Sequence, residues 1–244
     1  MRVQVNKESP VIADMFNNIA GRYDFLNRLL SFGIDKRWRR VLIKELMKKR
    51  PANALDIACG TGDIAISLYK KGVAVTGVDI AEKMIEIAEL KSDRVKKRNF
   101  GNDSISVQKP HFIHASADKL PIQNNLYDCV TIGFGIRNFE KRGESLLEIK
   151  RVLKNSGSLY ILEFATPGNY LWRSVYNFYF KSVLPAIGRV LSGQQHAYNY
   201  LPASVDTFPQ YNDFTAELEQ IGFKNVKYKS LTGGVVILYT ATNC

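Results

Sequence analysis

The sequence lacks the marks of a secreted, metal-binding or membrane-spanning chain. Its three cysteines, Cys59, Cys129 and Cys244, do not have the paired spacing of a disulfide framework or a zinc site. No apolar run reaches about 18 residues, so no transmembrane helix is expected. The first residues, MRVQVNKESPVIADMF, contain no apolar segment like that of a secretory signal. We therefore expect a cytoplasmic protein without a bound metal ion.

Acidic residues are scarce relative to basic ones. The chain has 34 Lys and Arg against 23 Asp and Glu, and this net charge of +11 favours an anionic partner such as nucleic acid or lipid. The basic segment 35–50 predicts a helix whose charges fall off the apolar stripe of Trp38, Val41, Leu42 and Leu46. Such a face is most often solvated; transient contact with the inner face of the cytoplasmic membrane is the alternative. The alternation of basic and aromatic residues that favours RNA is missing, so no nucleic acid partner is expected.

Helices and strands alternate in a way that suits one large domain of 244 residues. Residues 9–50 read as helical, and the polar residues 91–110 as the most loop-like region inside the sheet domain. Between and after them, short apolar runs separated by helical segments predict a parallel sheet covered on both faces. The predicted strands are 52–58, 73–79, 111–115, 127–134 and 157–164, and the helices are 63–71, 81–90 and 141–154.

The pattern changes after residue 165. Residues 169–192 are aromatic-rich and predict a helix, followed by a turn-prone loop. A helix over 210–221 then precedes two alternating segments, 224–231 and 235–242, that predict an antiparallel hairpin. We divide a single domain, 1–244, into four parts: a helical cap (1–50), a cofactor-binding core (51–165), a helical substrate-pocket insertion (166–210), and a terminal helix with its hairpin (211–244).

The segment ALDIACGTGDIA (54–65) is the strongest indication of a binding site. A strand, a glycine loop and a helix present free N–H groups to a ligand, although a plain strand-to-helix turn has the same pattern. Asp79 ends the second strand, where it can accept the ribose hydroxyls of a nucleoside or cap a helix. Asp56 would repel a pyrophosphate but suits a cationic ligand. Asp56, together with the predicted terminal hairpin, favours S-adenosylmethionine over a nicotinamide dinucleotide.

Two more segments follow predicted strands. ASADKLPI (115–122) fits an adenine site with small side chains around the base. GFGIRNFE (133–140) ends a buried strand in glycines and then places Arg137 beside Asn138. Ligands of open parallel sheets bind at this edge, although Arg137 could also form a salt bridge at the start of a helix.

In chain order, ALDIACGTGDIA, TGVDIAEKM, ADKLPI and YDCVTIGFGIRNF resemble the quinone C-methyltransferases of menaquinone and ubiquinone biosynthesis. The segments GRYDFLNRLLSFGIDKRW (21–38) and RVLKNSGSLYILEFA (151–165) resemble the two signatures of that family, and the likeness covers nearly the whole chain. The sequence departs from the family at Leu26, Asp35, Asn155-Ser156 and Ala165, where relatives usually have Met, His, Pro-Gly and Ser. Ser116 stands where many relatives have Asp or Asn.

The resemblance implies a Rossmann-like class I S-adenosylmethionine-dependent methyltransferase fold. The implied reaction is C-methylation of a prenylated quinol, with demethylmenaquinol as the acceptor and a ubiquinone-pathway benzoquinol as the alternative. The implied cofactor residues are Asp56, Gly60, Thr61, Gly62, Asp79, Ile80, Ser116, Ala117 and Gly133.

The implied catalytic residues are Arg137, Asn138, Tyr23 and Asp24. A guanidinium stays protonated at neutral pH, so Arg137 is predicted to stabilise the quinol oxyanion or to orient a water that takes the proton. Asn138 would add a donor, and Tyr23 with Asp24 would close the site.

Other functions and partners remain open. An RNA methyltransferase of the same fold suits the charge, but GFGIRN stands where an Asn-Pro-Pro-Tyr motif would be expected. A non-enzymatic nucleotide-binding or assembly protein is a further alternative, because one fold can serve several functions. The aromatic residues of 169–192 would either line a prenyl tail or form ordinary core, and a homodimer is neither favoured nor excluded.

Overall fold

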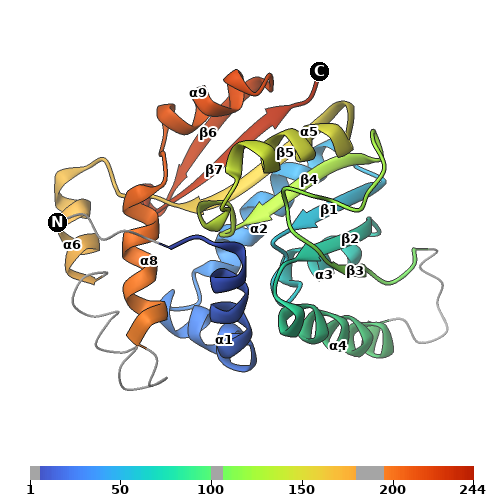
Figure 1. The fold of residues 1–244 in the computed structure, drawn as a ribbon, viewed down its shortest axis with the longest axis horizontal. Helices are drawn as coiled ribbons and strands as arrows, with labels where there is room; N and C mark the ends of the chain where they lie inside the picture. Colours follow the sequence, from blue (N-terminus) through green and yellow to red (C-terminus); the bar gives the residue numbers. More distant parts are fainter. Residues whose placement is uncertain (1–5, 100–106, 180–194) are drawn as a thin grey trace.

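A computed structural model describes residues 6–99, 107–179 and 195–244 (Figure 1). Helices α1 (Ser9–Leu30) and α2 (Asp35–Leu46) precede the first strand. The central part contains β1 (Asn53–Ile57), α3 (Asp63–Tyr69), β2 (Ala74–Asp79), α4 (Glu82–Asn99), β3 (His111–His114), β4 (Tyr127–Gly133), α5 (Arg142–Val152) and β5 (Leu153–Phe164). The rest contains α6 (Tyr170–Phe178), α8 (Gln195–Thr207), α9 (Asn212–Gln220), β6 (Lys224–Leu231) and β7 (Val236–Thr242).

The strands of the described residues form one seven-stranded sheet in the order β3-β2-β1-β4-β5-β7-β6. Strands β1 to β5 pair in parallel, and β7 runs antiparallel to both β5 and β6. The predicted mostly parallel sheet with a C-terminal antiparallel hairpin is therefore confirmed. The strand order reverses between β1 and β4, and such a switch point opens a crevice at the carboxyl ends of the strands.

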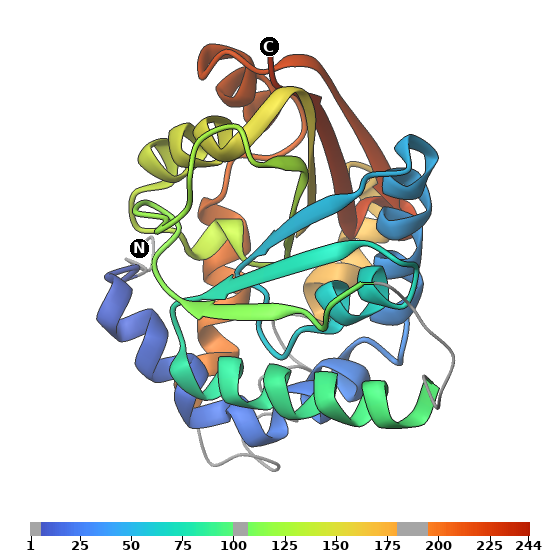
Figure 2. The ribbon, with the colours of Figure 1, turned by 90° about the vertical axis from the view of Figure 1, so that its right-hand side faces the viewer.

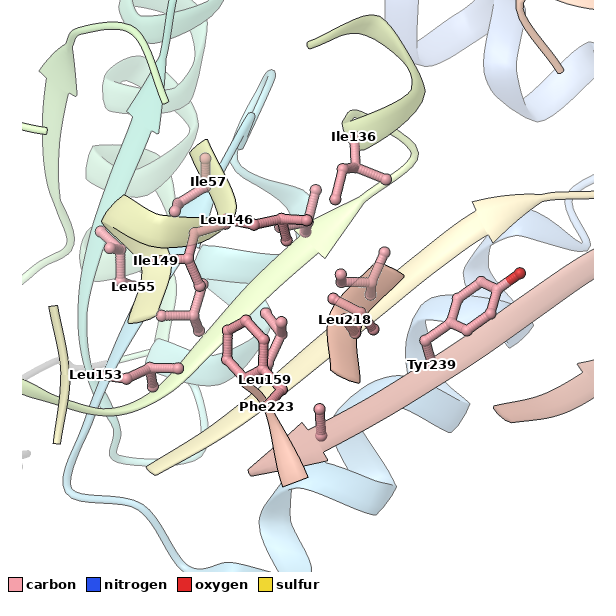
Figure 3. Packing of buried hydrophobic residues seen from close by; sticks show 14 of the residues in the cluster. Leu55, Ile57, Ile136, Leu146, Ile149, Leu153, Leu159, Leu218, Phe223 and Tyr239 are labelled. Atoms are coloured by element: carbon pink, nitrogen blue, oxygen red, sulfur yellow. The ribbon is translucent and has the colours of Figure 1, made fainter. Parts of the chain in front are cut away.

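Apolar side chains cover both faces of the sheet because successive residues of a strand point to opposite faces. In β5, Leu159 and Ile161 belong to the cluster in Figure 3, which α5 and α9 cover. Tyr160 and Leu162 alternate with them and point to the opposite face, which α2 and α3 cover. With both faces buried, the strand ends at the switch point are held on a rigid base.

The N-terminal helices have different neighbours. In α2 the predicted stripe is present, with Trp38, Leu42 and Leu46 buried against the sheet. Helix α1 instead lies against α4, where the main-chain N–H of Lys83 donates to Asn17 Oδ1 at 3.0 Å (Figure 2). No helix within the described residues is long and apolar enough to cross a membrane.

Several predicted boundaries are wrong. Helix α4 continues to Asn99, so 91–99 are helical instead of loop; Lys and Arg are good helix formers, so a polar segment can extend a helix. The predicted loop before 210 contains helix α8, which continues through Pro202. Strand β5 begins at Leu153 and not at 157. Of the predicted helix 169–192, residues 170–178 are helical, and 180–192 lie outside the described residues.

Candidate active site

The loop between β1 and α3 follows a backbone path that most side chains disfavour. Ala58, Gly60 and Gly62 have positive φ angles of 52°, 53° and 78°. A Cβ on Gly62 would lie 3.1 Å from the Cβ of Ala88 on α4, so glycine lets the loop pass close to that helix. The two glycines of the predicted fingerprint therefore shape the loop, which lies at the switch point of the sheet.

A small cleft of about 80 Å³ opens beside this loop, with Asp79 on its wall. Asp79 Oδ2 accepts the N–H of Gly60 at 2.7 Å, and Oδ1 accepts the N–H of Ala81 at 2.9 Å. Each carboxylate oxygen has a second lone pair, so Asp79 can accept two further donors from a ligand. Burial raises the pKa of Asp79, although the backbone donors oppose that shift.

Asp56 is occupied by protein donors. The residue is 1% exposed; its Oδ1 accepts the Thr131 hydroxyl at 2.7 Å, and its Oδ2 accepts the N–H of Ala65 at 3.2 Å. Burial raises the pKa of Asp56 to about 7, against the effect of these two bonds. Asp56 therefore ties β1 to β4 and to the first turn of α3, a structural role that the sequence did not indicate.

A larger cavity of about 400 Å³ opens at the same strand ends. Its walls are mainly apolar and aromatic, and they come from α1, α2, α6, α8 and the strand ends. The cavity and the small cleft share five lining residues, which are Phe16, Tyr23, Ala58, Gly133 and Phe134. They are therefore adjoining compartments that meet at the carboxyl ends of β1 and β4.

Arg137 lies on the short 3₁₀ turn after β4 and lines the larger cavity. Its Nη1 donates to Glu163 Oε1 at 2.7 Å and to the carbonyl of Phe134, and its Nε donates to Ser204 Oγ at 3.3 Å. The guanidinium carbon lies 5.5 Å from the ring centroid of Phe164. The salt-bridge alternative is thus present in the structure, while the guanidinium still forms part of the cavity wall.

Asn138 faces the small cleft, so the adjacent side chains of Arg137 and Asn138 belong to different compartments. The hydroxyl of Tyr200 donates to Asn138 Oδ1 at 2.9 Å. Burial raises the pKa of Tyr200 to about 12, so this hydroxyl stays protonated at neutral pH. The bond fixes the amide of Asn138 with its NH₂ group as the part able to donate to a ligand.

An ionic network connects α1 to the glycine loop. Lys91 Nζ lies 2.8 Å from Asp24 Oδ2 and 2.5 Å from Asp63 Oδ1. The Thr61 hydroxyl donates to Asp24 Oδ1 at 2.6 Å. Burial would raise the pKa of Asp63, but Lys91 and Arg39 lower it. The network holds α1 over the loop, and the predicted site residue Asp24 serves in it and not in a cavity wall.

Asp35, one of the departures from the family pattern, begins α2 and is buried. It accepts the Ser31 hydroxyl at 2.8 Å and pairs with Arg39. A carboxylate in the first turn also interacts favourably with the helix dipole. Asp35 lines the larger cavity as well, so it combines a structural role with a position beside the site.

Most of the residues predicted from the sequence gather around the two compartments. Those on the small cleft are Asp79, Ile80, Ser116, Ala117, Asn138, Tyr23 and Gly133. Those on the larger cavity are Asp56, Thr61, Arg137, Tyr23 and Gly133. Gly60, Gly62 and Asp24 line neither compartment. Sequence reasoning missed Glu163, Ser204, Tyr200, Lys91, Asp63 and Arg39; only Glu163 had a signal, as a lone acid in an apolar strand.

Comparison with solved structures identifies the fold. Magnesium protoporphyrin IX methyltransferase (ChlM) from Synechocystis PCC 6803 with bound SAH has a TM-score of 0.65 and 18% identity, over 97% of this chain and 100% of that one. A SAM-dependent methyltransferase from Thermotoga maritima has a TM-score of 0.63 and 14% identity, over 95% and 99%. The fold is that of the Rossmann-like class I S-adenosylmethionine-dependent methyltransferases.

Within that class, the chain belongs to the ubiE/COQ5 methyltransferase family, whose model matches residues 3–243. The ubiquinone/menaquinone biosynthesis C-methyltransferase UbiE of Geotalea uraniireducens is 41% identical over 97% of each chain. The demethylmenaquinone methyltransferase of Bacteroides fragilis is 38% identical over 97% of this chain and 94% of its own. That of Chlorobaculum tepidum is 40% identical over 96% and 93%. The family resemblance seen in the sequence is confirmed.

Proposed function

We propose that this protein transfers the methyl group of S-adenosylmethionine to a ring carbon of a prenylated quinol, with demethylmenaquinol as the acceptor. One observation carries the proposal: a small cleft beside Asp79 meets a large aromatic cavity beside Arg137 at the ends of β1 and β4. A donor and an apolar acceptor would meet at that junction. The activities named for the relatives support the same reaction.

The small cleft fits the adenosine part of the cofactor. Asp79 has lone pairs for two ribose hydroxyls, and Ser116 with Ala117 would border the base. Ile80 and Met84 add apolar surface for the purine ring. Thr61, on the larger cavity, would border the methionine part. When bound, this cofactor supplies an electrophilic methyl group on its sulfonium.

The larger cavity fits a quinol ring followed by the first part of a prenyl tail. The rings of Phe134 and Phe164 lie 4.6 Å apart at the end nearest the cleft, and Trp38 lies 6.0 Å from each of them. Such rings favour an aromatic acceptor by stacking and apolar contact. The Trp38 indole N–H is occupied by Thr232 Oγ1 at 2.8 Å, which holds that ring in position.

The acceptor carbon becomes nucleophilic when the neighbouring quinol hydroxyl loses its proton to water. With the cofactor bound, this carbon would form a bond to the methyl group as the carbon–sulfur bond breaks, and the ring carbon would then release its proton to water, which restores aromaticity. Arg137 stabilises the quinol oxyanion by donating from the guanidinium edge at the cavity. Glu163 holds that guanidinium in place and balances its charge in a buried setting.

The proposal is tested with purified protein, S-adenosylmethionine and soluble short-tailed acceptors. Demethylated naphthoquinol, the matching benzoquinol and unmodified tRNA are supplied separately, and methylated products are identified by mass spectrometry. Methylation of the naphthoquinol is the expected result. Transfer to the benzoquinol alone would move the acceptor to the ubiquinone pathway, and transfer to tRNA alone, or to none of the three, would overturn the proposal.

A further inference from the structure

The mouth of the larger cavity continues into exposed apolar surface. Phe32, Trp172 and Val175 line the cavity, yet they are 76%, 51% and 61% exposed. The turn after α1 and helix α6 meet there, because the Tyr179 hydroxyl donates to the Leu30 carbonyl at 2.5 Å. We call this surface the apolar rim; it consists of Phe25, Leu29, Phe32, Ile34, Tyr170, Leu171, Trp172, Val175 and Phe178.

The rim extends beyond the cavity along both helices. Phe25 and Leu29 are four residues apart on α1, Phe32 lies in the turn that follows this helix, and Leu171, Val175 and Phe178 follow one another at i, i+4 and i+7 on α6. Phe25, Leu171 and Phe178 line neither compartment and are 60%, 74% and 67% exposed. Large contiguous apolar patches on soluble domains mark interaction sites. In Figure 1, α6 lies at the left of the view, α8 lies beside it, and α1 lies lower and toward the centre.

Positive charge borders the rim. Helix α2 starts directly after Ile34, and its exposed face carries Lys36, Arg37, Arg40 and Lys44. The nearby carboxylates of Asp24 and Asp35 are paired with Lys91 and Arg39. An apolar centre with a basic border is complementary to an anionic bilayer surface. A second copy of the chain fits less well, since a symmetric contact would bring the same basic borders together.

We propose that the apolar rim and the basic face of α2 together dock on an anionic lipid bilayer, so that the larger cavity opens onto the membrane. This inference rests on the proposed function, because a prenyl tail would otherwise have to leave the acyl chains for water. Phenylalanine and leucine side chains would enter the acyl boundary, while Tyr170 and Trp172 suit the headgroup level. The basic helix face that the sequence suggested as a membrane contact would thus be the border of a larger surface.

Vesicle sedimentation tests the rim directly. Phe25→Ser with Leu171→Ser is compared with Leu126→Ser with Leu147→Ser, a matched pair of exposed leucines outside the rim. In vesicles of phosphatidylglycerol and phosphatidylcholine, we expect the rim pair to lose at least tenfold in affinity, and the control pair to bind like the parent. Lys36→Gln with Arg37→Gln should lower the affinity for these vesicles about tenfold and make it less dependent on salt. Lys70→Gln with Lys71→Gln, at the end of α3, is the control and should bind like the parent.

Activity separates docking from chemistry. With a soluble short-tailed acceptor the rim pair should keep the parental kcat/KM, and with a long-tailed acceptor in vesicles it should lose at least tenfold. Parental vesicle binding by the rim pair would overturn the docking proposal. The docking proposal would also be overturned if sedimentation equilibrium showed that the parent is a dimer and that the rim substitutions dissociate it. Failure of the parent to methylate the soluble acceptor would instead overturn the proposed function. The vesicle sedimentation experiment would still test the docking surface, because it does not depend on activity.

Discussion

The carboxylate of Glu163 holds the guanidinium of Arg137 in a buried ion pair, with 2.7 Å between Nη1 and Oε1. The two side chains are 0% and 8% exposed, so neither charge is well solvated. Glu163 also accepts the backbone N–H groups of Arg137 and Phe164, at 3.2 and 2.9 Å. The backbone therefore fixes the carboxylate, the carboxylate fixes the guanidinium, and the guanidinium reaches the cavity in one orientation.

Arg137→Lys tests the proposed oxyanion role. Lysine keeps a positive charge for Glu163, but it cannot donate in the fixed fork of a guanidinium. We expect kcat for the soluble quinol to fall about 10²-fold or more, on the scale of one lost oxyanion donor. Cofactor affinity, measured by calorimetry, should stay within about twofold of the parent. Near-parental turnover would remove Arg137 from the reaction.

Glu163→Gln tests whether Glu163 positions the guanidinium of Arg137. Glutamine has nearly the same shape but no charge, so the buried guanidinium loses its counter-ion. We expect the free energy of unfolding to fall by about 3 kcal/mol and kcat to fall at least tenfold with little change in KM. Glu163→Asp keeps the charge and should recover part of the activity. A stability loss with unchanged kcat would make Glu163 purely structural.

Lys91→Gln tests the network that holds α1 over the glycine loop. The substitution removes ion pairs to Asp24 and Asp63 and the bond to Thr61. Each partly exposed ion pair contributes about 1 kcal/mol or less, so the loss of two pairs and a hydrogen bond should loosen α1 over the loop. We therefore expect the Kd for S-adenosylmethionine to rise about tenfold and hydrogen exchange of α1 to accelerate. Lys83→Gln, on the exposed face of the same helix, is the control. Equal cofactor affinity in both variants would separate the network from binding.

The sheet was predictable because its strands are short apolar runs that alternate with helices at regular spacing. Hydrophobic periodicity also located the stripe of α2. Helix α8 was not predictable in the same way, since Pro202 and the polar residues around it resemble a loop. Burial of Ser204 and Val205 against the rest of the molecule supports that helix, and local sequence carries no trace of this packing.

The candidate site was predicted only in part for a similar reason. Asp79 and Arg137 follow strands whose ends a parallel sheet brings together, so topology alone places them near a ligand. The side chains that bind the Arg137 guanidinium, those of Glu163 and Ser204, come from β5 and α8, more than twenty residues away along the chain. Spacing likewise gave no sign that Thr131 and Ala65 would occupy the carboxylate of Asp56. Such pairings depend on three-dimensional register, which a single sequence does not report.

Asp56→Asn tests that structural role through pH. Burial raises the pKa of Asp56 from 3.8 to about 7, so the folded protein binds this proton more tightly than the unfolded chain. The free energy of unfolding then falls as pH rises through this range, and the contribution levels off above the folded pKa.

We would measure the free energy of unfolding in urea, without cofactor, at about pH 5 and pH 8. Between these two values it should fall by about 2–3 kcal/mol more in the parent than in Asp56→Asn. Asp14→Asn, an exposed carboxyl on α1, should show no such difference. If the gap between parent and Asp56→Asn does not change with pH, the Asp56 carboxylate is ionised in the folded state at neutral pH. An ionised Asp56 carboxylate would be able to bind the cationic part of the cofactor, as the sequence predicted.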